Sequence, residues 1–327
     1  MMNDPTAPDR SVQPQVRRVK RDVHGWLVLD KPVGMTSTHA VAVIKRLYSA
    51  KRAGHAGTLD PLASGLLPIA LGEATKTVPF VMDGRKTYRF TVRWGEERDT
   101  DDSEGRVTAT GEARPTAEAI RALLPRFTGT IEQIPPRFSA IKIGGERAYD
   151  LAREGEVVEL APRSVDIHRL ELVETLDADH SVFAAECGKG TYVRALARDM
   201  GRALGCHGHV TALRRTGVGP FQECDAVALD ALRAAAPPEG GDPAALMALL
   251  QPVAAGVRAI PSLDVSRADA ARLARGQAVL LRGRDAPIMQ GFVAVSTHGE
   301  LIALAEFERG ELRPRRIFNL GTGAGPG

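Results

Sequence analysis

One acidic side chain stands alone in a stretch rich in glycine and apolar residues. Within residues 52–72, RAGHAGTLDPLASGLLPIALG, the only acid is Asp60, which comes directly before Pro61. Gly54 and Gly57 permit backbone conformations that other residues avoid, and the proline restricts Asp60. Such a loop can hold one carboxylate rigidly in a cleft while a ligand approaches the backbone. The alternative is an ordinary turn with a local hydrogen bond, and the spacing alone favours that alternative.

An arginine elsewhere in the chain can keep such a carboxylate ionised. Burial favours the neutral form of an aspartate, and a nearby arginine opposes this effect. Arg194 lies in GKGTYVR, near the start of a helix predicted over residues 191–204. Arg198 and Arg202 follow it at four-residue spacing and form one basic stripe with it. The spacing therefore leaves two interpretations of Arg194 open, a partner for a carboxylate and a member of a solvated helix face.

The segments around these residues predict a mixed α/β domain. WLVLD, residues 26–30, is typical of a buried strand, and Thr36 or Ser37 can cap a following helix. TYRFTVRW, residues 87–94, alternates as a strand does and places Tyr88 on an apolar face, where it could equally be a core residue. VDIHRLELV, SVFAAEC and HVTALRRT predict further strands. The acidic run EERDTDDSEG, residues 96–105, predicts an exposed turn.

The composition is that of an ordinary globular protein. The chain has 327 residues and a net charge of +3, which permits a polyanionic partner without requiring one. Three cysteines predict no disulfide framework and indicate a reducing cytoplasm. The N-terminal MMNDPTAPDR lacks the basic start and apolar run of a signal peptide, and no apolar run is long enough to span a bilayer. We therefore expect a soluble, cytoplasmic protein without membrane contact.

Two other patterns in the sequence could be sites of chemistry. Cys206, His207 and His209, with Cys187 or Cys224, could form a zinc site. However, the chain has no C-x₂-C pair, and CHGH lacks a second half at ligand spacing, so we expect no metal. LGEATKT lacks the second glycine of a phosphate-binding loop, which argues against nucleotide hydrolysis.

Five motifs occur together in one order. They are LDKPVGMTS, GHAGTLDPLASGLL, KTYR, GKGTYVR and ALRR, and they span about residues 25–225. In order and spacing they resemble the bacterial tRNA pseudouridine-55 synthases of the TruB family. The C-terminal segment resembles, less closely, a PUA domain, the small β-rich RNA-binding module often joined to such synthases. This second resemblance rests on order, size and pieces such as GQAVLL and LIALAEF.

The resemblance implies roles for individual residues. Asp60 corresponds to the essential carboxylate that attacks the nucleoside. Tyr88, in KTYR, corresponds to the tyrosine that packs on the target base and takes part in proton transfer. Arg194, in GKGTYVR, corresponds to the arginine that pairs with the catalytic aspartate. Arg198 and Arg202 remain candidate phosphate contacts.

Four further residues are implied to bind the substrate. His55 corresponds to the histidine that helps to hold the flipped-out nucleotide, and Tyr192 to an aromatic residue near the same pocket. Leu213, in ALRR, corresponds to an apolar residue that lines the uracil pocket. Lys31 belongs to the KPxGxTS motif beside the site. Without the resemblance, His55 is a loop-ordering hydrogen bonder and Leu213 is ordinary core.

The implied reaction agrees with a single carboxylate. Pseudouridylation breaks the C1′–N1 bond, turns the uracil within the site and rejoins it through C5. No redox step occurs and no group is lost, so no cofactor is expected. A hydrolytic glycosidase normally uses two carboxylates because it must also activate water. The lone acid of the loop therefore favours isomerisation over hydrolysis.

The resemblance also predicts the architecture. We expect a pseudouridine synthase fold of the α/β (α+β) class, with a mixed, largely antiparallel central sheet and flanking helices. The catalytic domain should span residues 23–255, with a lobe over residues 116–155 that closes over RNA. A PUA-like RNA-binding domain should follow over residues 256–320. Residues 1–22 and 321–327 are predicted to be flexible tails, the first of them basic.

The expected substrate is the T-arm of tRNA, bound by a monomer that needs no guide RNA or protein partner. The nearest alternative is the catalytic subunit of a guide-RNA pseudouridylation particle, which shares these motifs. The predicted lobe and the bacterial form of the motifs argue against it. An alternative of another class is an RNA-folding chaperone that does not depend on catalysis, either as the main function or as a second one.

Overall fold

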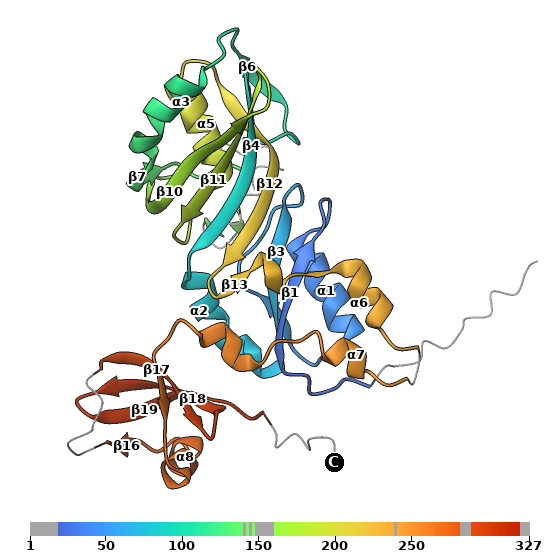
Figure 1. The fold of residues 1–327 in the computed structure, drawn as a ribbon, viewed down its shortest axis with the longest axis vertical. Helices are drawn as coiled ribbons and strands as arrows, with labels where there is room; N and C mark the ends of the chain where they lie inside the picture. The colour runs from blue at the N-terminus through green and yellow to red at the C-terminus, as the bar shows by residue number, and fades with distance from the viewer. Residues whose placement is uncertain are drawn as a thin grey trace, which may run out of the picture.

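The computed structural model describes residues 19–139, 142–143, 146–147, 160–238, 241–281 and 289–320. The molecule is elongated, with a long central sheet and a smaller C-terminal sheet beside one end of it (Figure 1). Strands β4 (Lys86–Trp94) and β12 (Gly208–Val218) run along the molecule and connect its two main halves (Figure 1). The KTYR and ALRR motifs therefore lie on two neighbouring strands of one sheet.

The central sheet is mixed and largely antiparallel, which confirms the predicted fold class. Its strands follow the order β14-β1-β3-β12-β4-β11-β10-β7, with β2 paired to β3 and β13 paired to β12. Strand β1 pairs in parallel with β14, and β3 pairs in parallel with β12. Besides β4 and β12, these strands are β1 Gly25–Lys31, β2 Ala53–His55, β3 Ser64–Leu71, β7 Gly129–Gln133, β10 Arg163–Thr175, β11 His180–Cys187, β13 Phe221–Gln222 and β14 Val227–Ala228.

Helices flank this sheet (Figure 1). They are α1 Ser37–Leu47, α2 Val78–Asp83, α3 Ala117–Leu123, α5 Val193–Ala203, α6 Leu229–Ala235 and α7 Ala244–Met247, with 3₁₀ turns η1 Gly72–Thr77, η2 Leu124–Phe127, η3 Glu223–Asp225 and η4 Val253–Val257. Two short hairpins complete this part: β5 Glu96–Arg98 with β6 Val107–Thr110, and β8 Lys142–Ile143 with β9 Glu146–Arg147. Thr36 caps α1 as predicted, because its hydroxyl accepts a hydrogen bond from the His39 amide. None of the described helices is both long and apolar enough to cross a membrane.

Strand β4 has the predicted alternation of buried and exposed residues. Phe90, Val92 and Trp94 are buried in the main core, and Tyr88 is half-buried on the same face. The Phe90 ring stacks on Phe183 of β11, with the ring centroids 5.4 Å apart. The pleat of one strand thus fixes the direction in which Tyr88 points.

The C-terminal part is β-rich, as predicted. Its sheet has the order β15-β17-β18-β19-β16. The elements are β15 Ser262–Asp264, α8 Arg267–Ala274, β16 Val279–Leu280, β17 Gly291–Thr297, β18 Glu300–Glu308 and β19 Glu311–Ile317. Leu304 and Phe318 share a hydrophobic cluster with Trp26 and Val81 of the larger part. The two parts are therefore packed together through apolar side chains.

The structure describes parts of two predicted segments. Within the tail predicted over residues 1–22, the Arg21 amide donates to Ser49 O at 2.8 Å and Asp22 pairs with Lys51 at 2.7 Å. Within the lobe predicted over residues 116–155, β7 is the outer strand of the central sheet. Of this lobe, residues 140–141, 144–145 and 148–155 lie outside the described residues, as do residues 1–18 and 321–327.

The exposed acidic turn over residues 96–105 is the clearest wrong prediction. Asp101 and Asp102 are only 5% and 2% exposed. Arg198 pairs with the first and Arg194 with the second. Two acids become buried here because two arginines from a distant helix neutralise them.

Candidate active site

The loop that carries Asp60 is held by the LDKPVGMTS motif. Ser37 Oγ donates to Leu59 O at 2.9 Å and accepts from the Leu59 amide at 2.8 Å. The Gly34 amide donates to Pro61 O at 2.7 Å. These bonds flank Asp60 on both sides, so its backbone is fixed while its side chain stays 34% exposed.

Lys31 ties the same two segments together from inside. It is fully buried, and its Nζ donates to Pro32 O and Met35 O at 2.8 Å each and to Pro61 O at 3.4 Å. Burial lowers the pKa of Lys31 to about 8, and the charge of Arg215 acts in the same direction while Asp60 opposes it. Lys31 therefore lies beside the site, as the resemblance implies, with its ammonium engaged by backbone oxygens.

Arg215 holds the Asp60 loop through backbone carbonyls, and it was not among the site residues predicted from the sequence. It is 2% exposed, and its guanidinium donates to Leu66 O at 2.8 Å and to Thr58 O and Gly57 O at 3.1 Å each. Gly57 has φ +102°, which favours glycine, as predicted. Gly54 lies in extended β2 without such a φ, so that part of the prediction is wrong. The ALRR motif could have indicated Arg215, which is its second arginine.

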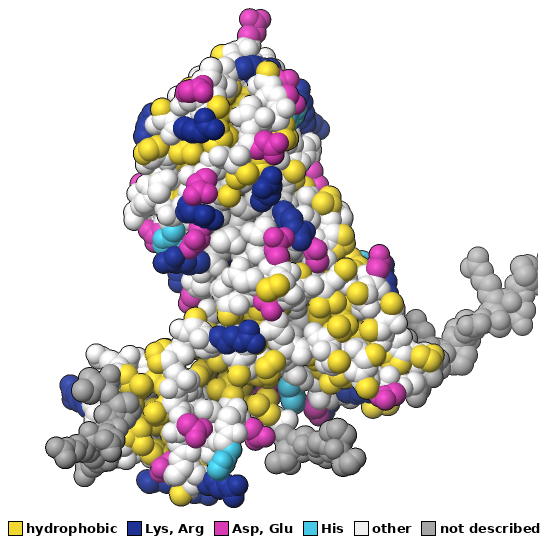
Figure 2. All heavy atoms as spheres, viewed as in Figure 1, with side chains coloured by type: hydrophobic (Ala, Val, Ile, Leu, Met, Phe, Trp, Pro, Cys, Tyr) yellow, Lys and Arg dark blue, Asp and Glu magenta, His cyan; other side chains and the backbone are white. Residues whose placement is uncertain are grey.

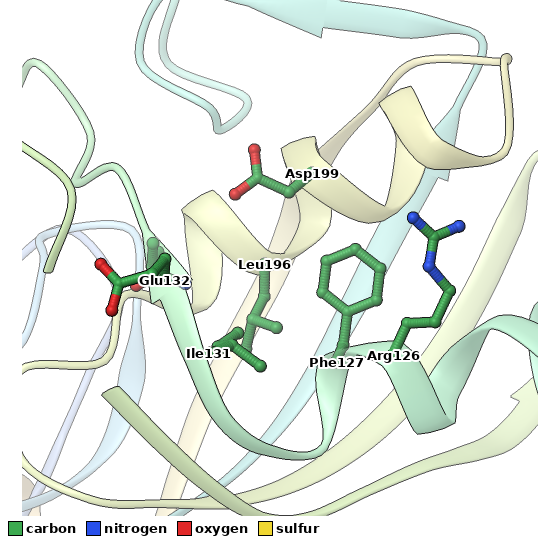
Figure 3. A pocket seen from close by; sticks show the side chains of 7 residues that line it. Arg126, Phe127, Ile131, Glu132, Leu196 and Asp199 are labelled. Atoms are coloured by element: carbon green, nitrogen blue, oxygen red, sulfur yellow. The ribbon is translucent and has the colours of Figure 1, made fainter. Parts of the chain in front are cut away.

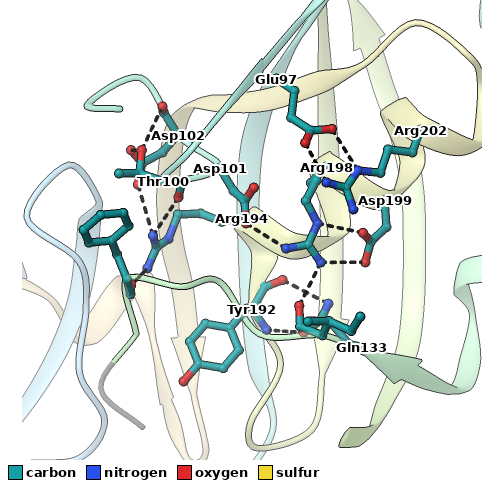
Figure 4. Close-up of polar contacts among 12 residues, drawn as sticks. Glu97, Thr100, Asp101, Asp102, Gln133, Tyr192, Arg194, Arg198, Asp199 and Arg202 are labelled. Atoms are coloured by element: carbon teal, nitrogen blue, oxygen red, sulfur yellow. Dashed lines mark hydrogen bonds and ion pairs between the residues drawn. The ribbon is translucent and has the colours of Figure 1, made fainter. Parts of the chain in front are cut away.

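Arg194 pairs directly with Asp60. Its Nε lies 2.9 Å from Asp60 Oδ2, and its Nη1 lies 3.3 Å from Asp102 Oδ2. The same guanidinium donates to Thr100 O at 2.9 Å (Figure 4) and to Phe138 O at 2.9 Å. The side chain is 5% exposed, so the solvated-face interpretation is wrong for Arg194. Of the two interpretations, the structure supports the carboxylate partner.

Asp102 is a second carboxylate near the site that the sequence did not reveal. Its Oδ1 accepts from Thr100 Oγ1 at 2.6 Å and from the Glu104 amide at 3.1 Å, while Oδ2 faces Arg194. The single acid of the Asp60 loop is thus not the single acid of the site. Because Asp102 is 2% exposed and its oxygens are engaged, Asp60 remains the more accessible carboxylate.

Leu213 lines a cavity of about 420 Å³ beside this centre. Phe90 pairs with Leu213 on the neighbouring strand and forms another part of the wall. Leu62 and Ser64 come from the segment after Asp60, and Glu104 comes from the turn after Asp102. Neither Asp60 nor Tyr88 forms the wall. The two acid-bearing segments therefore both contribute to the wall, which mixes apolar side chains with charged ones such as Arg89, Glu104 and Arg214.

Tyr88 and His55 lie close to Arg215. Tyr88 faces Arg215 across the β4–β12 pair. Burial raises the pKa of Tyr88 and keeps the phenol protonated. Burial also lowers the pKa of His55, and the charge of Arg215 adds to this effect while the Gly57 backbone opposes it. His55 therefore favours its neutral form.

Tyr192 is held at the start of helix α5. Its amide donates to Gln133 Oε1 at 2.9 Å, and Gln133 Nε2 donates back to Tyr192 O at 3.1 Å (Figure 4). Burial is the main cause that raises the pKa of Tyr192, and the charge of Asp60 also raises it. The aromatic ring thus stands near Asp60 on a rigid backbone.

Arg198 and Arg202 do not present free charges to a phosphate. Arg198 is 7% exposed and pairs with Asp101 and Asp199, while Arg202 pairs with Glu97 at 2.6 Å. The predicted phosphate contact is therefore wrong for Arg198, and the Arg202 charge is already neutralised. Figure 2 shows basic and acidic side chains interspersed over the viewed face.

A second cavity of about 340 Å³ lies between helix α5 and the segment that contains η2 and β7 (Figure 3). Phe127, Ile131 and Leu196 form its apolar wall, and Asp199 and Glu132 stand at its edge. No predicted site residue lines it. Among the described residues, no group of three or more His, Cys, Asp or Glu side chains is placed to hold a metal ion.

Comparison with known proteins agrees with this geometry. Residues 45–193 match the N-terminal domain model of TruB family pseudouridylate synthases, and residues 194–258 match the tRNA pseudouridylate synthase B C-terminal domain. The tRNA pseudouridine synthase B of Bradyrhizobium diazoefficiens is 70% identical over 99% of this chain and 94% of its own length. That of Brucella abortus is 55% identical over 92% of this chain and 97% of its own.

Solved structures with the same fold come from larger assemblies. The archaeal box H/ACA Nop10-Cbf5 complex aligns with a TM-score of 0.67 at 27% identity, over 90% of this chain and 86% of that one. A Cbf5-Nop10-Gar1 complex aligns with a TM-score of 0.66 at 28% identity, over 86% and 78%. With relatives this similar along nearly its whole length, the chain belongs to the TruB family of pseudouridylate synthases.

Proposed function

We propose that this enzyme isomerises uridine 55 in the T-loop of tRNA to pseudouridine, with Asp60 as the catalytic carboxylate. The observation that carries the proposal is the pairing of a partly exposed Asp60 with the buried Arg194, 2.9 Å apart. This pairing places a fixed guanidinium against the more accessible carboxylate of the site before the substrate arrives. The cavity beside it offers apolar side chains, among them Leu62, Phe90 and Leu213, that a uracil ring could contact.

Asp60 would act on the nucleoside while the base changes its bond from N1 to C5. The C1′–N1 bond breaks and the C1′–C5 bond forms. C5 then loses its proton, and N1 gains one. Asp60 can serve by attack at C1′, by attack at C6 of the uracil, or by driving elimination to a glycal. Tyr88 is the proposed proton carrier, because burial keeps its phenol protonated and it faces Arg215, which binds the Asp60 loop.

The target base must leave the T-loop stack before it can react. Flipping costs a few kcal/mol, and stacking on aromatic side chains recovers about 1–3 kcal/mol per base. We assign this stacking to Tyr88 and Tyr192, and we assign the holding of the nucleotide to His55. Leu213 would contact the uracil from the cavity wall. Lys31 would act by fixing the Asp60 loop.

The proposed substrate is the T-arm of tRNA, bound by a monomer in the cytoplasm without cofactor, guide RNA or protein partner. The relative at 70% identity is named tRNA pseudouridine synthase B, whereas the archaeal box H/ACA Nop10-Cbf5 complex and the Cbf5-Nop10-Gar1 complex are only 27% and 28% identical. We assign residues 256–320 to a PUA-like module that adds contacts to RNA. Phosphate contacts should make tRNA binding salt-dependent.

Incubation of the purified protein with an unmodified tRNA transcript tests the proposal. Pseudouridine should map to position 55, and Asp60→Asn should abolish it while binding tRNA. Product formed by Asp60→Asn would refute the carboxylate mechanism, and a requirement for added guide RNA would favour the particle subunit. Restoration of tRNA folding by the inactive variant would establish chaperoning as a second function.

A further inference from the structure

A second buried ion pair lies directly behind the Arg194 centre. Arg198 Nη1 lies 2.9 Å from Asp101 Oδ2, and the two residues are 7% and 5% exposed. The remaining guanidinium atoms are also engaged: Nη2 donates to Ile134 O at 2.8 Å, and Nε donates to Asp199 at 2.8 Å. The reaction proposed above does not use this pair. Two buried charges that do not contact Asp60 call for another explanation.

Asp101 has a backbone conformation that is costly for a residue with a side chain. Its φ is +60°, in the left-handed region. The segment is pinned on both sides, since the Val210 amide donates to Asp101 O at 3.1 Å and the Ser103 amide donates to Val210 O at 3.0 Å. Conformations of this kind persist where the surroundings fix them, and they cluster at functional sites.

Two ion pairs link the turn that contains residues 101–102 to helix α5. We call the Asp102–Arg194 pair the inner rung and the Asp101–Arg198 pair the outer rung. Asp101 and Asp102 are adjacent in the turn, and Arg194 and Arg198 lie four residues apart on α5. Residues at this spacing lie on the same face of a helix, one above the other. Each acid binds one arginine, at 2.9 Å for Asp101 with Arg198 and 3.3 Å for Asp102 with Arg194 (Figure 4). The two rungs therefore fix both the position and the rotation of α5 relative to the turn.

The inner rung has a further constraint, because its arginine also contacts Asp60. Arg194 must reach Asp60 with Nε while its Nη1 stays with Asp102. A small rotation of α5 or a shift of the turn would move the guanidinium away from one of these carboxylates. The outer rung prevents such a shift, because Arg198 also binds the strand-end carbonyl of Ile134.

We propose that the Asp101–Arg198 pair is a positioning element for catalysis, which holds Arg194 in register with Asp60. This inference rests on the proposed function of Asp60. Asp101 and Arg198 are positioning residues and touch no substrate. Their loss should therefore lower kcat and leave KM for tRNA and the affinity for tRNA nearly unchanged.

Arg198→Lys tests the inference because it keeps the charge and removes the planar fork. Asp101→Asn is the second variant, since asparagine tolerates the left-handed backbone and removes only the charge. The matched control is Arg202→Lys, the same change one turn further along α5, where Arg202 pairs with Glu97 and is 53% exposed. Steady-state kinetics, tRNA filter binding and thermal unfolding are measured for each.

We expect kcat to fall by about 10- to 100-fold in both test variants, as a misplacement of about 1 Å produces. KM and tRNA affinity should stay within about twofold of wild type, as should kcat of the control. A test-variant kcat within about twofold of wild type, or a loss that appears in KM, overturns the inference. So does unfolding of both variants at the assay temperature, which would make the pair a folding element. An active Asp60→Asn would instead refute the proposed function.

Discussion

The Nε atom of Arg194 lies 2.9 Å from the Oδ2 atom of Asp60. The guanidinium cannot swing away from this contact, because its other nitrogens bind Asp102 and the carbonyls of Thr100 and Phe138. A charge that is fixed before the substrate arrives needs no reorganisation during the reaction. The arginine is thus part of a preformed centre.

Replacement of Arg194 by glutamine should affect catalysis and stability separately. Loss of the guanidinium leaves Asp102 buried without its counter-charge, which should cost about 3–5 kcal/mol of unfolding free energy. It should also lower kcat strongly, since Asp60 loses its partner. Urea unfolding and single-turnover kinetics measure the two effects.

The double variant Arg194→Gln/Asp102→Asn is the control for this prediction. It removes the uncompensated charge, so stability should largely recover while kcat stays low. Recovery of both quantities would show that Arg194 acts only through folding. No loss of either in the single variant would contradict the role of the ion pair.

Arg215 offers a separate test of how the Asp60 loop is held. Arg215→Lys keeps the charge, but one ammonium cannot replace three guanidinium contacts to Gly57, Thr58 and Leu66. We expect faster hydrogen exchange at residues 57–60 and a lower kcat, with the rest of the sheet unchanged. The control is Arg233→Lys, on α6 with a side chain 59% exposed. Unchanged exchange at the loop would show that Arg215 does not support it.

The sequence predicts those parts of the fold in which local pattern and burial agree. β4 alternates along its length because a single face is buried, and Thr36 caps α1 because that bond forms within one turn. Asp101 and Asp102 were misjudged because their burial depends on arginines more than ninety residues later in the chain, as Arg198 to Asp101 shows. The role of Arg215 could not be predicted either, because its carbonyl partners, such as Thr58 O, lie on a loop far away in the sequence. Within the site, the pairing of Asp60 with Arg194 could be predicted only from the two motifs that contain them.

Lys31 should make stability depend on pH in the alkaline range. Its pKa falls from 10.5 to about 8 in the folded protein, mainly because it is buried. Between these values the unfolded chain binds the proton more tightly, so the free energy of unfolding should rise with pH, by at most about 1.4 kcal/mol per pH unit. Urea unfolding of wild type and Lys31→Met across this range measures the difference.

The Lys31→Met variant should show a smaller rise than wild type, whatever its stability at neutral pH. The part of the rise that remains belongs to Lys86, because burial lowers the pKa of Lys86 to about 8 as well. Lys189→Met, at a side chain 71% exposed, is the control and should follow the wild-type slope. Parallel slopes for wild type and Lys31→Met would mean that Lys31 keeps its ordinary proton affinity in the folded state.

Glu73 joins the C-terminal module to the catalytic part and allows a last test. Its carboxylate, 4% exposed, accepts from Arg52 at 3.0 Å, from Lys76 at 2.5 Å and from the Asn319 amide at 2.9 Å. Burial raises the pKa of Glu73, but the bonds from Lys76 and Asn319 outweigh it and the net pKa is lowered. The carboxylate therefore contributes stability that is present above pH 4.5, the ordinary glutamate value, and is lost as pH falls through the lower folded value.

Glu73→Gln should lower the free energy of unfolding by about 1.5–3 kcal/mol near neutral pH, the range for hydrogen bonds to a charged group. The difference from wild type should shrink as the pH falls below 4.5, where the wild-type carboxylate also becomes neutral. Limited proteolysis should release the C-terminal module faster in the variant, because Asn319 loses a charged acceptor. Glu308→Gln, whose side chain is 50% exposed, should change neither quantity. A pH-independent difference would assign the loss to packing and not to the charge of Glu73.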